Sequence, residues 1–404
     1  MMFFDHGLLW LVALSLSAWL YLLLGRSGFW RTRPLLERLS ATTRDPPDVV
    51  AVVPARDEAA CVGRALRSLL GQDYPGRLSV ILVDDHSEDA TRAIAQAVPV
   101  PPGRSLTVIA ARPLPRGWSG KLWALSEGLG HASRCMPGAC YVLLTDADIA
   151  HDPGNLRRLV AKADAEGLDL VSLMVRLHCE HFWERLLIPP FVFFFRKLYP
   201  FAAVNRQDDP VAAAAGGCAL VRRTALARIG GIEAIRDQLI DDVALARRIK
   251  HHPLPSSGQI WLGLTESTRS LRRQTRLCEL WAMIARCADA QLEHSLARLG
   301  LTTVAMLTLY LAPPLAVIAW PLHGDEAIEA LGLAAWLCMT LAYLPTVRLY
   351  RLPPHWTLTL PLAAGLYTAM TMDSAWRHRR GKGGQWKGRI APPAARRSSP
   401  DSAG

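Results

Sequence analysis

Two carboxylates one residue apart follow a short apolar segment near the middle of the chain. Residues 141–145 read Tyr-Val-Leu-Leu-Thr, and Asp146 and Asp148 come directly after them. Such a run predicts a buried parallel strand, and open α/β sheets bind ligands at the carboxyl ends of their strands. Carboxylate oxygens suit Mg²⁺ or Mn²⁺. The pair predicts a divalent-metal site that would neutralise a diphosphate, although a turn cap before Pro153 would use the same residues.

Further polar residues follow two other predicted strands. Residues 49–53 and 80–83 are valine-rich apolar runs. The first leads into Pro54, Asp57 and Glu58, and the second into Asp84 and Asp85. Because parallel strands bring their carboxyl ends to one edge of a sheet, we expect these acids to lie close to Asp146 and Asp148. Together they predict one crevice lined by carboxylates.

Two more segments offer chemistry on helices. A glycine-rich turn over residues 117–121 ends in Lys121 at a predicted helix start, where an anionic phosphate would bind. Asp241 and Asp242 open a predicted helix, where the helix dipole alone would favour them. The sequence has no G-x-x-x-x-G-K-[ST], and no G-x-G-x-x-G follows the first strand. This argues against a P-loop and against a dinucleotide-binding site.

Strands and helices alternate between residues 49 and 250. Further strands are expected at 106–110 and 168–175, and Ser87 is expected to cap the helix after the second strand. This alternation predicts an α/β fold built on a doubly wound, mostly parallel sheet.

Membrane segments are predicted at both ends of the chain. Residues 7–25, 301–322, 330–347 and 356–372 carry no charge, and each run is near the roughly 20 residues that span a bilayer. Arg26, Arg31 and Arg33 follow the first run, which favours a retained anchor with the next domain in the cytoplasm. We therefore expect a membrane anchor (1–26), a linker (27–47), a cytoplasmic domain (48–298), C-terminal membrane segments (299–376) and a basic, partly disordered tail (377–404).

Two aromatic segments are expected at the membrane surface. Residues 182–201 mix phenylalanines with basic residues and contain Pro189-Pro190, which favours an in-plane membrane segment over core packing. Residues 277–299, with Trp281 and Arg286, predict an amphipathic helix.

Much of the charge behind the net value of +11 lies beside the predicted membrane segments and in the C-terminal tail. It therefore indicates anionic headgroups and not nucleic acid. The eight cysteines are scattered, with no CxxC, so neither a disulfide framework nor a zinc site is indicated.

The order of these motifs resembles the family 2 glycosyltransferases, which have a GT-A fold. The similar segments are Val53–Glu58, Val83–Thr91, Gly120–Ala124, Thr145–Asp148 and Asp241–Asp242. The resemblance implies transfer of a sugar from a nucleotide diphosphate donor, with Asp146 and Asp148 holding Mg²⁺ or Mn²⁺ and Asp242 as general base. It also implies that Pro54, Asp57, Glu58, Asp84, Asp85, Lys121, Asp146, Asp241, Trp281 and Arg286 contact substrates.

A narrower resemblance points to the hopene-associated glycosyltransferases of bacterial hopanoid gene clusters. It is carried by Trp118–Lys121, the phenylalanine-rich segment, Trp281–Arg286 and Trp386–Arg389. It implies a polycyclic lipid context. We expect a multi-pass protein of the bacterial inner membrane that transfers the sugar to a lipid hydroxyl, in hopanoid or related lipid metabolism. The Gln-x-x-Arg-Trp of processive synthases is absent, because Thr275-Arg276-Leu277 follows Gln274. We therefore expect single transfers and not polymer synthesis.

Other functions remain open at this stage. A polyprenyl-phosphate sugar synthase would use a phosphate as acceptor. A catalytically silent membrane scaffold would be expected to lack the acids at the strand ends, and a transporter would be expected to carry polar groups within its spans. The topology is also open. Three full spans after the cytoplasmic domain would put the basic tail outside, whereas the positive-inside tendency favours a cytoplasmic tail and one incomplete span.

Overall fold

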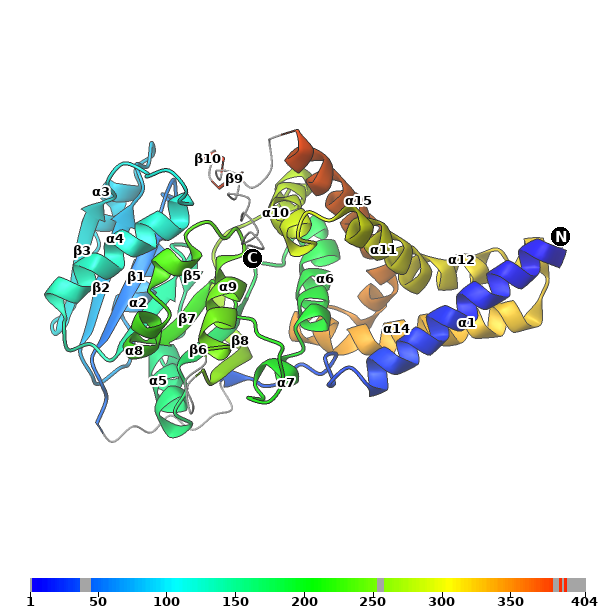
Figure 1. Cartoon of the computed structure of the whole chain (residues 1–404), viewed down its shortest axis with the longest axis horizontal. Coiled ribbons are helices and arrows are strands. Elements are labelled where there is room, and N and C mark those ends of the chain that lie inside the picture. The colour runs from blue at the N-terminus through cyan, green and yellow to red at the C-terminus, as the bar shows by residue number, and fades with distance from the viewer. Residues whose placement is uncertain (1, 37–44, 253–257, 381–384, 387–388, 391–404) are drawn as a thin grey trace, which may run out of the picture.

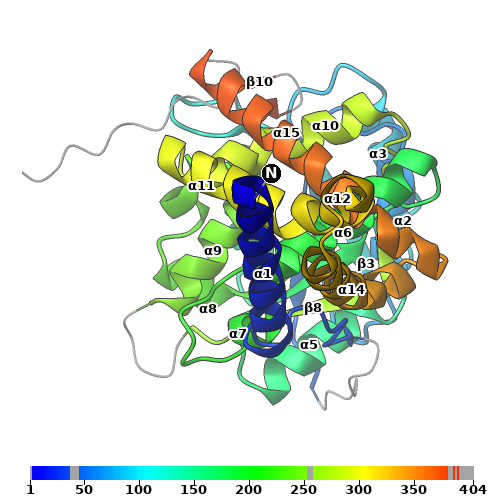
Figure 2. The same ribbon diagram turned by 90° about the vertical axis from the view of Figure 1, so that its right-hand side faces the viewer.

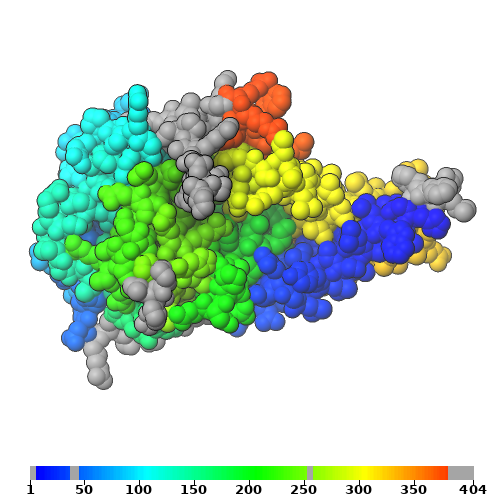
Figure 3. Space-filling model, viewed as in Figure 1, coloured from blue at the N-terminus to red at the C-terminus, as the bar shows by residue number. Residues whose placement is uncertain are grey.

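The computed structural model describes residues 2–36, 45–252, 258–380, 385–386 and 389–390. A sheet domain occupies one end of the molecule and a group of long apolar helices the other (Figure 1). Between them lie α6 (Phe182–Leu198), α10 (Leu277–Gln291) and α15 (Leu360–Arg379). The space-filling view shows the apolar helices as a narrow projection from a broader body (Figure 3).

The sheet has eight strands in the order β3-β2-β1-β4-β7-β6-β8-β5. Their bounds are β1 Val49–Ala55, β2 Leu78–Asp84, β3 Arg104–Ala110, β4 Tyr141–Thr145, β5 Ile149–Ala150, β6 Leu170–Arg176, β7 Cys218–Arg222 and β8 Ile260–Ser270. β1, β2, β3 and β4 are parallel to one another, as are β6 and β8. β7 runs antiparallel to both β4 and β6, and β5 runs antiparallel to β8. The predicted α/β fold with a mostly parallel sheet is therefore confirmed.

Helices cover both faces of the sheet. Their bounds are α2 Val62–Leu70, α3 Thr91–Gln96, α4 Gly120–Cys135, α5 Asn155–Ala165, α7 Phe201–Val204, α8 Arg223–Arg228, the short 3₁₀ helix η2 Ile232–Ile235, and α9 Asp241–Lys250. Val50 and Val52 of β1 belong to a core with residues of α4 and α9. Val49, Ala51 and Val53 face a second core with α2 and α5. A strand that is buried on both faces needs a continuous apolar run, which is why β1 was recognisable.

The predicted helix cap at Ser87 is wrong. Helix α3 begins at Thr91 after Ala90, without a side-chain cap. The Ser87 hydroxyl instead accepts a hydrogen bond from the backbone N–H of Asp57 at 3.0 Å. Ser87 therefore joins the loops after β1 and β2, and its capping propensity is overridden by a contact distant in sequence.

Helix α6, Phe182–Leu198, is a buried connecting helix. Leu186, Leu187 and Val192 lie in the core of the sheet domain, whereas Phe193 lies in a core with the apolar helices. The predicted in-plane membrane segment is therefore wrong, because both sides of the helix meet protein. Pro189 and Pro190 lie within the helix and do not break it.

Three helical segments are long and apolar enough to cross a membrane, within the ranges that the structure describes. They are His6–Leu24 in α1 (Met2–Leu24), Leu296–Ile318 and Glu326–Leu349. The second comprises α11 Leu296–Met306, a π-helical turn η3 Leu307–Leu311 and α12 Ala312–Ile318, and the third is α14. α1, α12 and α14 pack together, as the end-on view shows (Figure 2). Large apolar side chains such as Leu14, Leu301 and Leu337 are exposed on the three candidate spans, as expected for lipid contact.

The fourth apolar run, 356–372, forms no candidate span. It begins in a 3₁₀ turn, η4 Pro354–Thr359, and continues in α15, Leu360–Arg379. α15 packs on α10, Leu277–Gln291, and on α6. The short α13, Trp320–His323, turns the chain between α12 and α14, so two candidate spans follow the sheet domain among the described residues. Crossing at both spans would place the sheet domain and the end of α15 on the same side of a membrane, as the expected cytoplasmic tail requires.

The structure adds detail near three of the predicted boundaries. The predicted linker includes Leu35, which bridges to Leu264 of β8. The amphipathic helix predicted over 277–299 ends at Gln291, and a loop separates it from α11. The tail predicted over 377–404 lies mostly outside the described residues, apart from the end of α15 and the short strands β9 Gln385–Trp386 and β10 Arg389–Ile390.

We expect Gly128→Ala to destabilise the sheet domain. A Cβ at Gly128 of α4 would lie 2.4 Å from Val52 Cγ1 and 3.0 Å from Val83 Cγ2. Such overpacking costs about 1–3 kcal/mol, more than the roughly 1 kcal/mol that alanine gains over glycine in a helix. The melting temperature in detergent, followed by circular dichroism, should fall.

Gly130→Ala on the same helix is the matched control. The nearest group to a Cβ there is Arg134 NH1 at 3.9 Å, so its melting temperature should be unchanged or slightly higher. If Gly128→Ala melts no lower than the wild type, the close approach of α4 to β1 and β2 is contradicted.

Candidate active site

A cavity of about 800 Å³ lies where the carboxyl ends of β1, β4 and β8 face the connecting helices. Eight of the residues predicted from the sequence line it: Pro54, Glu58, Lys121, Asp146, Asp148, Asp241, Asp242 and Arg286. They come from segments between residues 54 and 286, so the fold brings together most of the predicted crevice.

Lys121 joins two of the acid-bearing segments. It is the second residue of α4, whose first turn is capped by Ser119. Its Nζ lies 3.1 Å from Asp146 Oδ1 and 3.2 Å from Asp241 Oδ2. Burial by itself lowers the pKa of Lys121, but the charges of Asp146 and Asp241 raise it above its ordinary value. Lys121 is therefore a permanent cation between the loop after β4 and the start of α9.

Arg272 makes a second bridge across the cavity. Its Nε lies 3.1 Å from Asp148 Oδ2, and its guanidinium also pairs with Glu58. Ser270 Oγ donates to the same oxygen of Asp148 at 3.1 Å. Sequence reasoning missed Arg272. The only available signal was a cluster of four arginines between residues 269 and 276, which does not distinguish one from another.

Asp242 is held by backbone groups at the start of α9. Its Oδ2 accepts from the N–H of Gly216 and its Oδ1 from the N–H of Val243, both at 2.8 Å. Burial, and next the charge of Asp241, raise the pKa of Asp242 to about 6. A Cβ at Gly216 would lie 3.2 Å from Lys121 Nζ, so glycine lets this backbone approach the acids closely. A carboxylate with such a pKa can exchange a proton near neutral pH.

Three predicted acids near the carboxyl ends of β1 and β2 lie outside the cavity. Asp84 and Asp85 are buried at the end of β2, and Asp57 has a positive φ of 50°. Asp57 lies in the loop after β1, and its Oδ1 accepts a hydrogen bond from the N–H of Glu88, in the loop after β2, at 2.8 Å. The two loops are therefore joined. None of the three lines the cavity.

Trp281 is also placed outside the cavity. Its indole N–H donates to Asp373 Oδ2 of α15 at 2.6 Å, which fastens α10 to α15. Arg286, one and a half turns further along α10, does line the cavity. The two residues that the amphipathic segment contributed therefore have different surroundings.

The other half of the cavity is apolar and lies toward the membrane-type helices. Residues of α6, α10, α11 and α15 line it, including Phe194, Met283, Met306 and Tyr367. One continuous space thus runs from a cluster of acids to a wall that contains part of a candidate membrane span.

Comparison with known proteins gives the site its context. Residues 50–230 match the model of Glycosyl transferase family 2. The chain carries a family 2 glycosyltransferase domain. This match covers the strands that supply Asp57, Asp85, Asp146 and Asp148.

Two curated relatives match shorter segments of this glycosyltransferase domain. The succinoglycan biosynthesis protein ExoO of Rhizobium meliloti (strain 1021) is 36% identical over 134 residues, which are 31% of this chain and 35% of that protein. The undecaprenyl-phosphate 4-deoxy-4-formamido-L-arabinose transferase of Enterobacter sp. (strain 638) is 30% identical over 143 residues, 34% of this chain and 39% of that protein. The matches thus span little more than a third of either relative.

A solved glycosyltransferase structure resembles the whole fold. The mannosyltransferase PcManGT from Pyrobaculum calidifontis, solved in complex with GDP-Man and Mn²⁺, superposes with a TM-score of 0.50 and 19% identity. The superposition covers 91% of this chain and 99% of that one. It supports the GT-A-like architecture of the sheet domain.

Proposed function

We propose that the protein is a membrane-bound, inverting glycosyltransferase that moves a sugar from a nucleotide diphosphate to the hydroxyl of a lipid. The observation that carries this proposal is the cavity with two unlike halves. Its acidic half holds Asp146, Asp148 and Asp242, and its apolar half is formed by helices beside the candidate membrane spans. A donor that is charged and an acceptor that stays in the bilayer need such a division.

The acidic half fits a divalent ion. Asp146 and Asp148 supply the hard oxygen ligands that Mg²⁺ and Mn²⁺ prefer, and both already sit beside cations, Lys121 and Arg272 respectively. Mn²⁺ accompanies GDP-Man in the similar mannosyltransferase. When bound, the ion would supply positive charge for the leaving diphosphate.

The chain's own residues divide the remaining work. Lys121 and Arg272 place fixed positive charge where the diphosphate would lie. Asp242 accepts the proton of the attacking hydroxyl, and the backbone N–H of Gly216 holds its carboxylate in place. Asp57, Asp84 and Asp85, which lie at the carboxyl ends of β1 and β2 outside the cavity, are proposed to orient the nucleoside. A single displacement by that hydroxyl inverts the anomeric carbon.

The membrane arrangement follows from the three candidate spans. Arg26, Arg31 and Arg33 follow the first span, and Arg377, Arg379 and Arg380 end α15 on the same side as the sheet domain. Basic residues on one side favour the cytoplasmic face. We propose a multi-pass protein of the bacterial inner membrane with its catalytic domain in the cytoplasm.

A hopanoid-type polycyclic lipid is the acceptor we favour, on the narrower resemblance carried by Trp118–Lys121 and Trp281–Arg286. The last motif of that resemblance, Trp386–Arg389, includes residues 387–388, which lie outside the described ranges. The alternative acceptor is a polyprenyl phosphate, and the curated relative that bears undecaprenyl phosphate in its name favours it. A catalytically silent scaffold is disfavoured by the intact acid cluster.

Asp242→Asn should abolish most turnover and spare donor binding. The amide keeps the shape of the side chain but cannot accept the hydroxyl proton, and a general base is worth roughly 10²–10⁴-fold in rate. Sugar transfer to membrane lipid and donor affinity would be measured on the same preparation. Asp237→Asn, at an exposed acid before α9, is the control and should be unaffected. Equal loss of both quantities would contradict the role, and unchanged turnover would favour a phosphate acceptor.

The rate should also depend on pH through Asp242. Its carboxyl has a pKa of about 6, and only the unprotonated form can accept a proton. The value of kcat/KM should therefore be level above this pH and fall as the pH drops through it, because kcat/KM reports the free enzyme. A profile that is flat on both sides of that pH would exclude Asp242 as the base.

Asp148→Ala should remove the metal dependence of donor binding. Wild-type protein in detergent would be titrated with a panel of nucleotide diphosphate sugars, with and without Mn²⁺. One donor should bind more tightly with Mn²⁺ in the wild type, and this gain should vanish in the variant. Ser270→Ala, which removes only a hydrogen bond to Asp148, should keep most of the gain. A gain that survives in Asp148→Ala would place the ion elsewhere.

A further inference from the structure

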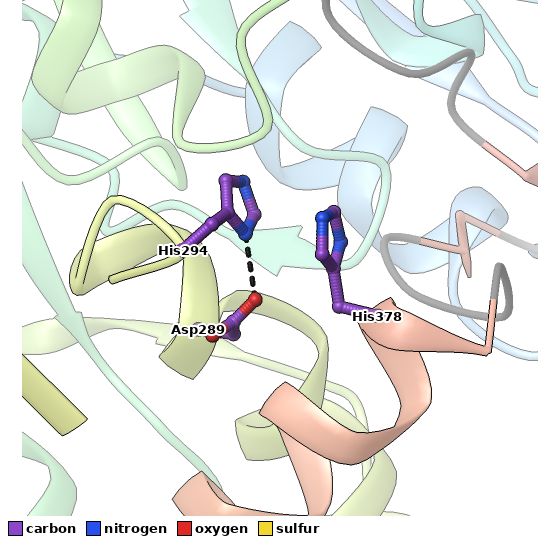
Figure 4. Close-up of side chains that lie close together, drawn as sticks. All are labelled: Asp289, His294 and His378. Carbon is purple, nitrogen blue, oxygen red and sulfur yellow. Dashed lines mark hydrogen bonds and ion pairs between the residues drawn. The ribbon is translucent and has the colours of Figure 1, made fainter. Parts of the chain in front are cut away.

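Two histidines and an aspartate form a cluster where the ends of α10 and α15 meet (Figure 4). One nitrogen or oxygen each from Asp289, His294 and His378 lie within 4.8 Å of one another. Asp289 lies in the last turn of α10, His294 in the loop after it and His378 near the end of α15. None of the three lines the cavity, and the proposed sugar transfer uses none of them.

The loop after α10 returns over its own helix to build this cluster. Glu293 and His294 have positive φ angles of 52° and 56°, which residues other than glycine rarely adopt. This turn brings His294 Nδ1 to 2.6 Å from Asp289 Oδ2. The backbone N–H of Asp289 donates to Ser374 Oγ of α15 at 3.0 Å. Asp289 and His294 are thus held against α15 by contacts within the protein.

The chemistry of the three side chains selects the kind of ion. Two imidazole nitrogens and one carboxylate oxygen are a ligand set typical of Zn²⁺. Mg²⁺ and Ca²⁺ prefer oxygen ligands only, so the acidic half of the cavity and this cluster differ in the ions they suit. We propose that Asp289, His294 and His378 bind one Zn²⁺, with a water molecule in the fourth position.

The rings must rearrange for the ion to bind. The imidazoles of His294 and His378 are stacked, with centroids 3.9 Å apart and planes at 15°. Nearly parallel rings cannot both direct a lone pair at an ion between them. His378 is exposed near the end of α15, so its side chain can turn about its own torsions. The ion would replace the hydrogen bond between His294 Nδ1 and Asp289 Oδ2, because a ligating nitrogen must give up its proton.

The ion would close a seam between two helices that wall the cavity. α10 contributes Met283 and Arg286 to the wall, and α15 contributes Tyr367 and Thr371. Trp281 ties the helices to each other through Asp373 at one level, and Ser374 does so further along. Zinc at the open end of this seam would add a third tie and stabilise the wall without touching substrate.

The test uses the full chain in detergent, stripped with a chelator and then titrated with Zn²⁺ by calorimetry in excess Mg²⁺. We expect one saturable Zn²⁺ per chain and a higher melting temperature with Zn²⁺, since an ion that binds only the folded state stabilises it. His294→Ala and His378→Ala should each weaken binding by about 10–100-fold or more, the cost of losing even an outer-shell partner. Both should also lose the rise in melting temperature.

Two controls separate this site from others on the chain. His355→Ala removes an exposed histidine in η4, and Asp148→Ala removes an acid of the cavity. Both should bind Zn²⁺ as the wild type does. The absence of saturable binding, binding as tight as that of the wild type in either histidine variant, or loss of binding in Asp148→Ala alone would each overturn the proposal. None of these results depends on sugar transfer.

Discussion

The structure depends on keeping five carboxylates close together in one partly enclosed cavity. Glu58, Asp146, Asp148, Asp241 and Asp242 all line it. Removing a charge from water costs several kcal/mol unless a partner compensates. Lys121 serves Asp146 and Asp241, and Arg272 serves Asp148 and Glu58. Asp242 has backbone N–H groups in place of a direct ion pair among the contacts described, and burial, followed by the charge of Asp241, raises its pKa. Burial also raises the pKa of Asp146, but Lys121 lies 3.1 Å from that carboxylate. Asp242 therefore differs from Asp146 in having a raised pKa without a direct cation partner among these contacts.

The segment that carries Arg272 also links this cluster to the helices beside the candidate membrane spans. Arg272 is followed closely by Gln274, whose backbone N–H donates to Glu184 of α6 at 2.8 Å. Burial by itself would raise the pKa of Glu184, but N–H groups that include His181 and Gln274 lower it to about 2. Further along α6, the buried Arg196 donates to Thr346 of α14 and to the carbonyl of Arg31. Helix α6 therefore contacts the loop that carries Arg272 and Gln274 at one end and the apolar helices at the other.

Local sequence patterns were sufficient for the sheet and for the acids at its edge. β1 is buried on both faces, so its valine run could be read without any tertiary information. Asp146 and Asp148 come directly after strand β4, and Asp242 lies in the first turn of helix α9, so local patterns located all three. Arg272 could not be found in this way, because its partners Glu58 and Asp148 are more than a hundred residues away. Ser87 could not be placed from local pattern either, because its partner Asp57 lies 30 residues earlier, after the neighbouring strand β1.

The misread helical segments lie between the sheet and the candidate membrane spans, and there is a physical reason for this. An aromatic, basic helix can lie on lipid or be covered by protein, and its composition is the same in both cases. α6 is covered because α10, α14 and α15 pack on it. Its Leu187 carbonyl accepts from Tyr367 of α15 at 2.8 Å, a contact that no local pattern encodes. α15 in turn packs on α6 and α10. It lines the cavity with Tyr367 and Thr371 and is not among the candidate spans by length and composition. Its packing on α6 and α10 accounts for where its apolar residues lie.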